Sequence, residues 1–234
     1  MSARLAAYAA RGLALAGALA AALAAAPASA HAQRVWTASA VVGRAEHRVD
    51  LGRAGTIVGV DSPVERSSGT VVGGSVDLGA TPWLEVEAHA LGGRLEAPTS
   101  GLGRDMGEVG VRASVLAFPW LVFQAGALSR GFQMTEGRQH WSALATGAEA
   151  RLDLSGGRVR GIVRASVLPA VSVSGDLDRP DLAVATAAGL EMHRGFFAGA
   201  VMYSLERYDF PSSVDAGRRL EQLGMITAKL GVRF

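Results

Sequence analysis

The sequence predicts an all-β fold, namely a closed antiparallel transmembrane β-barrel of about ten strands. Ten segments alternate apolar and polar residues with a period of two, the spacing of a strand with two unlike faces. The links between these segments are alternately short and long. The polar face carries too many charges for the core of a soluble sandwich, and the apolar face is too regular to face water. Together these observations predict apolar side chains outside and charges inside.

The first 32 residues have the pattern of a secretory signal peptide, so residues 33–234 remain as the barrel domain. Arg4 and Arg11 precede an uncharged stretch over 12–26, and small residues then permit cleavage after Ala30 or Ala32. That stretch is shorter than the roughly 20 residues that a membrane-spanning helix needs. We therefore expect export and cleavage.

Charge and composition exclude several classes of site. The chain has 23 basic and 21 acidic residues, so loss of Arg4 and Arg11 leaves 21 of each. It has no cysteine and five histidines. We expect no nucleic-acid partner, no disulfide, no metal and no cofactor.

The expected strands are defined by the limits of the alternation. In chain order they cover residues 35–46, 69–80, 83–93, 105–117, 120–131, 140–153, 158–173, 181–192, 196–208 and 220–234. A tilted barrel strand needs about 9 to 11 residues to cross the bilayer, and every segment is long enough. The pattern is weakest over 35–46 and 181–192, so eight strands is the alternative.

The apolar face can be read off the segments one by one. Its members are Val72, Val76 and Leu78 in the second segment, Val109, Val111, Val115 and Ala117 in the fourth, Leu144, Ala148, Ala150 and Leu152 in the sixth, Val159, Val163, Ala165 and Val167 in the seventh, and Ile226, Ala228, Leu230, Val232 and Phe234 in the tenth. In a barrel these residues face the lipid.

The links provide the more specific signal. Short links follow the even-numbered segments, at Thr81 to Pro82, Phe118 to Pro119, Leu154 to Gly157 and His193 to Gly195. Longer polar links follow the odd-numbered segments, at His47 to Ser68, Arg94 to Arg104, Phe132 to Gln139, Ser174 to Pro180 and Asp209 to Arg219. Short turns on one side and long loops on the other are typical of outer-membrane barrels, whose short turns are periplasmic.

Aromatic residues gather near the expected strand ends. Trp36, Trp83, Trp120, Phe196, Phe197 and Phe234 lie on the turn side, and Phe132, Trp141, Tyr208 and Phe210 lie on the loop side. We interpret them as two interfacial girdles.

The signal peptide, the ten segments and the ending "AKLGVRF" resemble the small bacterial outer-membrane β-barrel proteins. The resemblance implies location in the outer membrane, contact with its lipid and lipopolysaccharide, and recognition of the last strand by the barrel-assembly machinery. The assembly signal would comprise Leu230, Val232 and Phe234. The last segment must then pair with the first, because a closed sheet leaves no unpaired edge in hydrocarbon.

By alternation, charged side chains of both signs should meet in the lumen. The acids are Asp77, Glu85, Glu87, Glu108, Glu149, Asp153, Glu191 and Glu206, and the bases are Arg112, Arg151, Arg158, Arg160, Arg164, Lys229 and Arg233. The near balance of charge predicts an ion-paired, largely plugged interior with a structural or surface-interaction role. The alternative is a narrow pore in which Arg158, Arg160 and Arg164 favour anions.

An enzymatic function has weaker support, and we expect no catalytic residues. His140 and Ser142 form a His-x-Ser pair near the outer rim, similar to the motif of outer-membrane lipid A deacylases. The asparagine that usually follows that serine is replaced by Ala143, and the nearest acid, Glu149, should point inward.

The longest link, residues 47–68, is the remaining place for a surface ligand. It has an apolar patch at Ile57, Val58 and Val60, and Arg48, Arg53 and Arg66 could contact anionic sugars or phosphates. The simpler interpretation is a hairpin that extends the barrel above the membrane.

Overall fold

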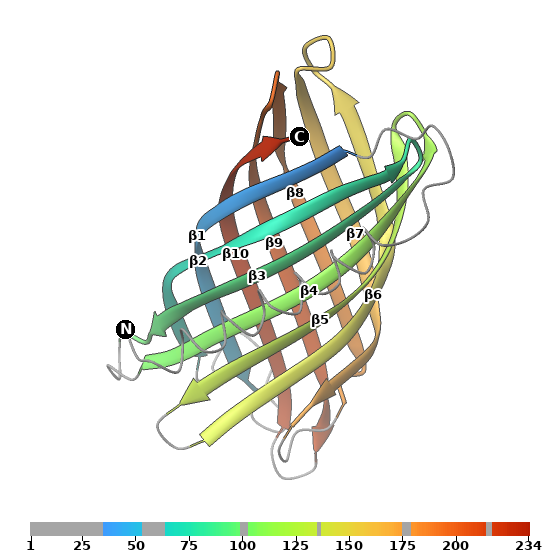
Figure 1. Ribbon diagram of the computed structural model, residues 1–234. Coiled ribbons are helices and arrows are strands. Elements are labelled where there is room, and N and C mark those ends of the chain that lie inside the picture. The colour runs from blue at the N-terminus through green and yellow to red at the C-terminus, as the bar shows by residue number, and fades with distance from the viewer. Residues whose placement is uncertain (1–34, 53–63, 99–102, 135–136, 175–178, 214–216) are drawn as a thin grey trace.

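The computed structural model describes residues 35–52, 64–98, 103–134, 137–174, 179–213 and 217–234, and these form a single barrel of ten strands (Figure 1). The strands are β1 Val35–Leu51, β2 Val64–Thr81, β3 Leu84–Glu96, β4 Gly103–Phe118, β5 Leu121–Met134, β6 Gly137–Asp153, β7 Val159–Val173, β8 Leu182–Arg194, β9 Phe197–Ser213 and β10 Gly217–Arg233. The predicted fold class and strand number are confirmed. In the described residues no helix is long and apolar enough to cross a membrane.

The sheet closes on itself. Every strand pairs antiparallel with its neighbour in sequence, and β10 pairs with β1. At the closing edge the backbone N–H of Trp36 donates to Phe234 O at 2.9 Å, and the N–H of Phe234 donates to Trp36 O at 2.9 Å. The barrel thus satisfies the backbone up to its last residue, and the eight-strand alternative is wrong.

Eight of the ten strands, all but β7 and β8, run further at the loop end than the alternation predicts. β1 continues to Leu51 instead of residue 46, and β2 begins at Val64 instead of residue 69. Backbone pairing does not depend on side-chain polarity, so the ladder continues after the outward residues become polar. The central part of the first loop, 53–63, and the expected signal peptide lie outside the described residues.

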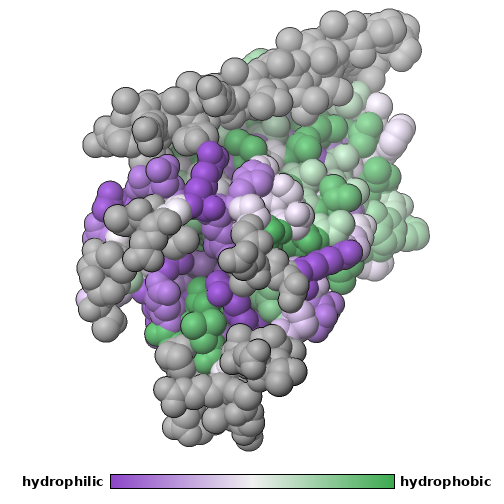
Figure 2. Space-filling view, turned by 90° about the horizontal axis from the view of Figure 1, so that it is seen from below, coloured by the Kyte–Doolittle hydropathy of each residue, from purple (hydrophilic) through white to green (hydrophobic). Residues whose placement is uncertain are grey.

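The two faces of the sheet are arranged as the alternation predicts. Large apolar side chains such as Val42, Phe123, Val163, Val201 and Ile226 are exposed on the outside. Figure 2, viewed from the loop end, shows hydrophobic side chains on the side of the barrel visible at the right and hydrophilic ones gathered around its mouth.

One aromatic group is not where the sequence predicted. Phe132, Trp141, Tyr208 and Phe210, expected in an interfacial girdle, are buried within the barrel. On β5, β6 and β9 these residues are an even number of positions away from residues that point inward, so they point inward as well. The girdle interpretation did not take this alternation into account. By contrast, Trp83, Trp120, Phe196, Phe197 and Phe234 are exposed at the turn end.

The β6–β7 turn is stabilised by two glycines with positive φ values and by hydrogen bonds to a carboxylate. Gly156 and Gly157 have φ values of 52° and 78°, which favour glycine. The Asp153 carboxylate accepts hydrogen bonds from the N–H groups of Ser155 (3.1 Å) and Gly157 (2.8 Å). Asp153, predicted in the lumen network, therefore stabilises a turn instead.

Candidate functional site in the barrel interior

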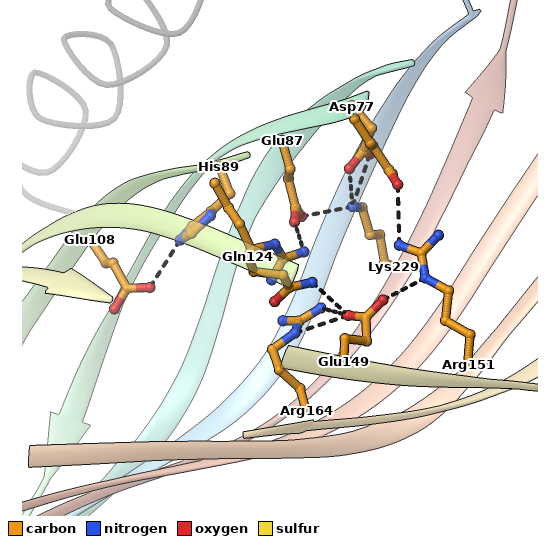
Figure 3. Close-up of polar contacts among 11 residues, drawn as sticks. Asp77, Glu87, His89, Glu108, Gln124, Glu149, Arg151, Arg164 and Lys229 are labelled. Atoms are coloured by element: carbon orange, nitrogen blue, oxygen red, sulfur yellow. Dashed lines mark hydrogen bonds and ion pairs between the residues drawn. The ribbon is translucent and has the colours of Figure 1, made fainter. Parts of the chain in front are cut away.

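The lumen is crossed by ion pairs in its turn-side half. Lys229 on β10 places Nζ 3.0 Å from Asp77 Oδ2 on β2 and 3.0 Å from Glu87 Oε1 on β3. Arg112 on β4 also binds Glu87. Figure 3 shows Lys229 between the two carboxylates. These charges come from four strands and neutralise one another.

Glu149 is the centre of a second group, and only 1% of its side chain is exposed. It accepts hydrogen bonds from Arg151 Nε (2.6 Å), Arg164 Nη2 (2.6 Å) and Gln124 Nε2 (2.9 Å) (Figure 3). Arg151 on β6 also reaches Glu85 Oε2 on β3 at 3.3 Å. Since β3 and β6 are not neighbours in the sheet, this contact bridges the interior.

Arg130 on β5 makes the most complete set of ionic contacts. Its side chain is 1% exposed, its Nε donates to Glu108 Oε2 at 2.6 Å, and its Nη1 donates to Glu206 Oε2 at 2.7 Å. Tyr208 Oη donates to the same Glu206 oxygen at 2.7 Å. Glu206 is on β9, which is not adjacent to β5, so Arg130 spans the lumen.

His89 completes this layer from β3. Its Nε2 is 3.1 Å from Glu108 Oε1 (Figure 3). A Cβ atom at Gly110 on the neighbouring strand would lie 2.5 Å from His89 Cε1. Glycine at position 110 therefore makes room for the imidazole inside the barrel.

Beyond Arg130 toward the loop end, the interior is filled by apolar and aromatic side chains. Trp141 packs against Tyr208 edge to face at 4.8 Å between ring centroids, and His47 stacks on Phe132 at 4.8 Å. His47 Nε2 also lies 2.9 Å from Glu221 Oε2. The rest of this cluster comprises Ala45, Val71, Leu95, Met106, Ala143, Leu168, Val171, Ala183, Phe210, Leu223 and Met225. The described lumen thus has an ionic part and an apolar part in series.

The structure brings together most of the predicted lumen residues and separates a few. The connected ones are Glu85, Glu87, Glu108, Arg112, Glu149, Arg151, Arg164 and Lys229. Arg160, Glu191 and Arg233 line a cavity at the turn end. Arg158 is exposed beside the β6–β7 turn. The pore interpretation grouped Arg158, Arg160 and Arg164, but these three arginines have three different environments.

Sequence reasoning missed Arg130, Gln124, His47 and Glu221. Arg130 could have been found, because Phe123, Ala125 and Ala127 face outward and their parity places residue 130 inside. Glu221 could have been found in the same way, because it has the parity of Lys229 within the predicted segment 220–234. His47 was assigned to a loop, and only the longer observed β1 puts it in the lumen.

The turn-side mouth of the lumen is a cavity of about 370 Å³. Its lining includes Asp77, Glu85, Arg151, Arg160, Glu191, Lys229 and Arg233 among the charged residues. Within the described part of the chain, no group of three or more His, Cys, Asp or Glu residues is arranged to hold a metal ion.

The outer surface carries arginines above the apolar band on one side of the barrel. The paired register places Arg66, Arg48, Gln222 and Arg207 next to one another across β2, β1, β10 and β9. We call these four residues the outer basic row. Arg48 also pairs with Asp50 at 3.0 Å. At the loop end of β9, Arg218 Nε donates a hydrogen bond to Asp209 Oδ1 at 2.8 Å.

Comparison with known proteins was made on sequence and on structure. No family model and no curated protein sequence matches the chain. Among solved structures, it is similar to the outer-membrane protease OmpT from Escherichia coli, with a TM-score of 0.52 and 10% sequence identity over 89% of this chain and 99% of that one. The chain has the fold of an outer-membrane β-barrel protein.

Two further barrels match with lower TM-scores. The translocator domain of the autotransporter NalP from Neisseria meningitidis has a TM-score of 0.43 at 12% identity and covers 94% of this chain and 92% of its own. The Neisserial surface protein A has a TM-score of 0.35 at 10% identity and covers 86% and 97%. At these identities the likeness concerns the fold.

Proposed function

We propose that this outer-membrane barrel is exported with residues 1–32 as a cleaved signal peptide and acts as a non-conducting protein with a structural or surface-interaction role. The observation that carries the proposal is Arg130, which is buried and bound to carboxylates on both sides of the lumen. Eight-stranded barrels are just filled by side chains and ten strands leave slightly more space. Here that space holds ion pairs and aromatic rings.

Electrostatics supports a lumen that is closed to ions at the level of Arg130. An ion passing Arg130 would have to separate it from Glu108 or Glu206 in a region of low dielectric constant, and unpairing buried charges is costly. Further toward the loop end the ion would meet Trp141, Tyr208 and Phe132, which provide little compensation for lost water. A narrow pore would form only if the ion pairs of Arg130 separated and the aromatic side chains moved apart at the same time.

The outer basic row supports a role at the membrane surface. It lies just beyond the exposed apolar residues Val42, Val72 and Ile226, on the loop side of the band that faces lipid. Arginine pairs well with phosphate groups. We infer that lipopolysaccharide is the partner on this side, together with any ligand of loop 47–68.

A catalytic role is not part of the proposal. His140 Nε2 is 3.3 Å from Ser142 Oγ on the outer face, as a deacylase-like pair would require. Glu149 faces the lumen and is bound to Arg151 and Arg164. The acid that would orient His140 is therefore engaged on the other side of the barrel wall.

The deciding experiment is single-channel recording of the refolded full barrel in planar bilayers, with Arg164→Ala recorded beside it. We expect no steady conductance steps from either protein, because Arg130 and the aromatic cluster close the lumen in both. Only protein whose gel mobility shifts on heating, and which is therefore folded, is added to the bilayer. A control porin added to the same bilayer verifies that barrels can insert and conduct.

The opposite result has a clear meaning. Steady ion-selective steps in the wild-type barrel that change in Arg164→Ala would overturn the proposal and establish a narrow pore lined by β7.

A further inference from the structure

The turn-side cavity is part of the lumen that the ion pairs leave open. Residues from all ten strands line its volume of about 370 Å³, so it is the mouth of the barrel itself. Its inner wall includes the ion pairs Lys229–Asp77 and Arg151–Glu85. Because Arg130 and the aromatic cluster fill the lumen further in, the cavity is reached from the turn end and is blind.

The basic residues of this cavity fall into two kinds. Lys229 and Arg151 are already neutralised by carboxylates. Arg160 and Arg233 also line the cavity, and in the described part of the chain neither of them makes a side-chain hydrogen bond or ion pair. Two guanidinium groups with free donors therefore share one concave space, where they can bind an oxyanion.

The remaining lining residues complete a small-molecule site. Thr37, Ser39, Thr81 and Ser114 place hydroxyl groups in the wall. Trp83, Leu84, Leu116 and Val35 give it an apolar portion. Ligand sites typically combine apolar walls with a few polar groups, and 370 Å³ is at the lower end of their usual volumes of about 300 to 1,000 Å³.

We propose that this cavity binds a small organic oxyanion, with its phosphate or carboxylate group paired to Arg160 and Arg233. The apolar part of the ligand lies against Trp83 and Leu84. Asp77 and Glu85 do not oppose binding strongly, because they are paired with Lys229 and Arg151. The third acid of the lining, Glu191, lies opposite Arg160 in the β7–β8 register, and the four Lys and Arg residues of the lining outnumber its three acids. The site faces the periplasmic side in the usual orientation of such barrels, in which the short turns are periplasmic.

The test is a calorimetric titration of the refolded full barrel in detergent with phenyl phosphate, benzoate and the uncharged benzyl alcohol. We expect saturable binding of the two anions and at least tenfold weaker binding of benzyl alcohol. The double variant Arg160→Gln with Arg233→Gln should lose at least tenfold in affinity for phenyl phosphate. Both replaced side chains lack ion pairs, so the variant should still fold, as a heat-dependent shift in gel mobility would verify.

The matched control is Arg194→Gln, since Arg194 is at the turn end of β8 but is exposed and outside the cavity lining. It removes one charge from the same end of the barrel and should bind phenyl phosphate as the wild type does. Wild-type affinity in the double variant, equal loss in Arg194→Gln, or no saturable binding of either anion would each overturn the proposal. The result of this titration is independent of the proposed function, because it measures neither conductance through the lumen nor binding of lipopolysaccharide at the outer surface.

Discussion

At the scale of single residues, the interior depends on side chains whose partners are on distant strands. Arg130 is the clearest case, because it is 1% exposed and bound to two carboxylates from β4 and β9. Removing one partner of a buried ion pair leaves an uncompensated charge, so such residues are expected to affect stability more than their surface counterparts.

Arg130→Met tests this directly. The variant keeps most of the side-chain volume but leaves Glu108 and Glu206 without their guanidinium partner. We expect a loss of about 3 to 5 kcal/mol in the free energy of unfolding, measured by urea titration of the barrel in lipid vesicles. Arg158→Met, at an exposed turn position, should change it by less than about 0.5 kcal/mol. Equal effects would show that Arg130 is not paired as described.

A second prediction at this scale concerns Gly110. Gly110→Ala would place a Cβ atom 2.5 Å from His89 Cε1, so the ring must move away from Glu108. We expect a loss of about 1 to 3 kcal/mol, as for other overpacked interiors. Gly107→Ala on the same strand is the control, since its Cβ would have no heavy atom within 4 Å. The same urea titration measures both, and a neutral Gly110→Ala would contradict the packing.

At the scale of elements, β10 both closes the barrel and carries the expected assembly signal. Its outward residues Leu230, Val232 and Phe234 are exposed, and 72% of Phe234 is accessible. The backbone of Phe234 is bound to Trp36, so the last residue is tied to the first strand. A terminus held in this way does not fray like a free chain end.

Deleting Phe234 should separate assembly in the cell from folding in vitro. We expect several-fold less barrel in outer-membrane fractions, because the terminal aromatic is the proposed recognition feature for the assembly machinery. The purified variant should still refold into lipid vesicles, since the other β1–β10 pairs remain. Phe196→Ala, which removes another exposed turn-end ring, should assemble normally. Normal assembly of the deletion variant would refute the signal.

At the scale of the whole molecule, the apolar outer band defines how the barrel sits in the bilayer. Val163 on β7 belongs to this band, whereas Val64 begins β2 at the loop end, beside the arginines of the outer basic row. The two side chains have similar chemistry but different expected depths. Their substitutions therefore measure the position of the membrane along the barrel.

Val163→Arg should lower the free energy of unfolding in lipid by about 2 to 4 kcal/mol, the cost of a basic residue facing lipid near the midplane. Val64→Arg should cost at most about 1 kcal/mol, because that cost falls toward the interfaces. Urea titration in vesicles of one lipid gives both values. Equal costs would place the membrane elsewhere on the barrel.

The sequence by itself determined that the chain forms about ten antiparallel strands and, by parity, which face most strand residues occupy. These properties follow from the period-two alternation and from the lengths of the turns and loops. Both are local features of the chain and do not depend on which residues meet across the lumen. Leu230 faces out and Lys229 faces in by parity alone. Even Arg130 could have been placed inside by this rule.

Only the tertiary structure decided which interior residues meet. The pairing of Arg130 with Glu206, of Arg151 with Glu85 and of His47 with Phe132 joins strands that are not neighbours in the sheet. Such contacts depend on the curvature and stagger of the closed barrel, which set the residues that face each other across the lumen. For the same reason Arg160 and Arg233 came to share one cavity. The inward positions of Trp141 and Tyr208 already follow from parity, but their contact with each other across the lumen does not.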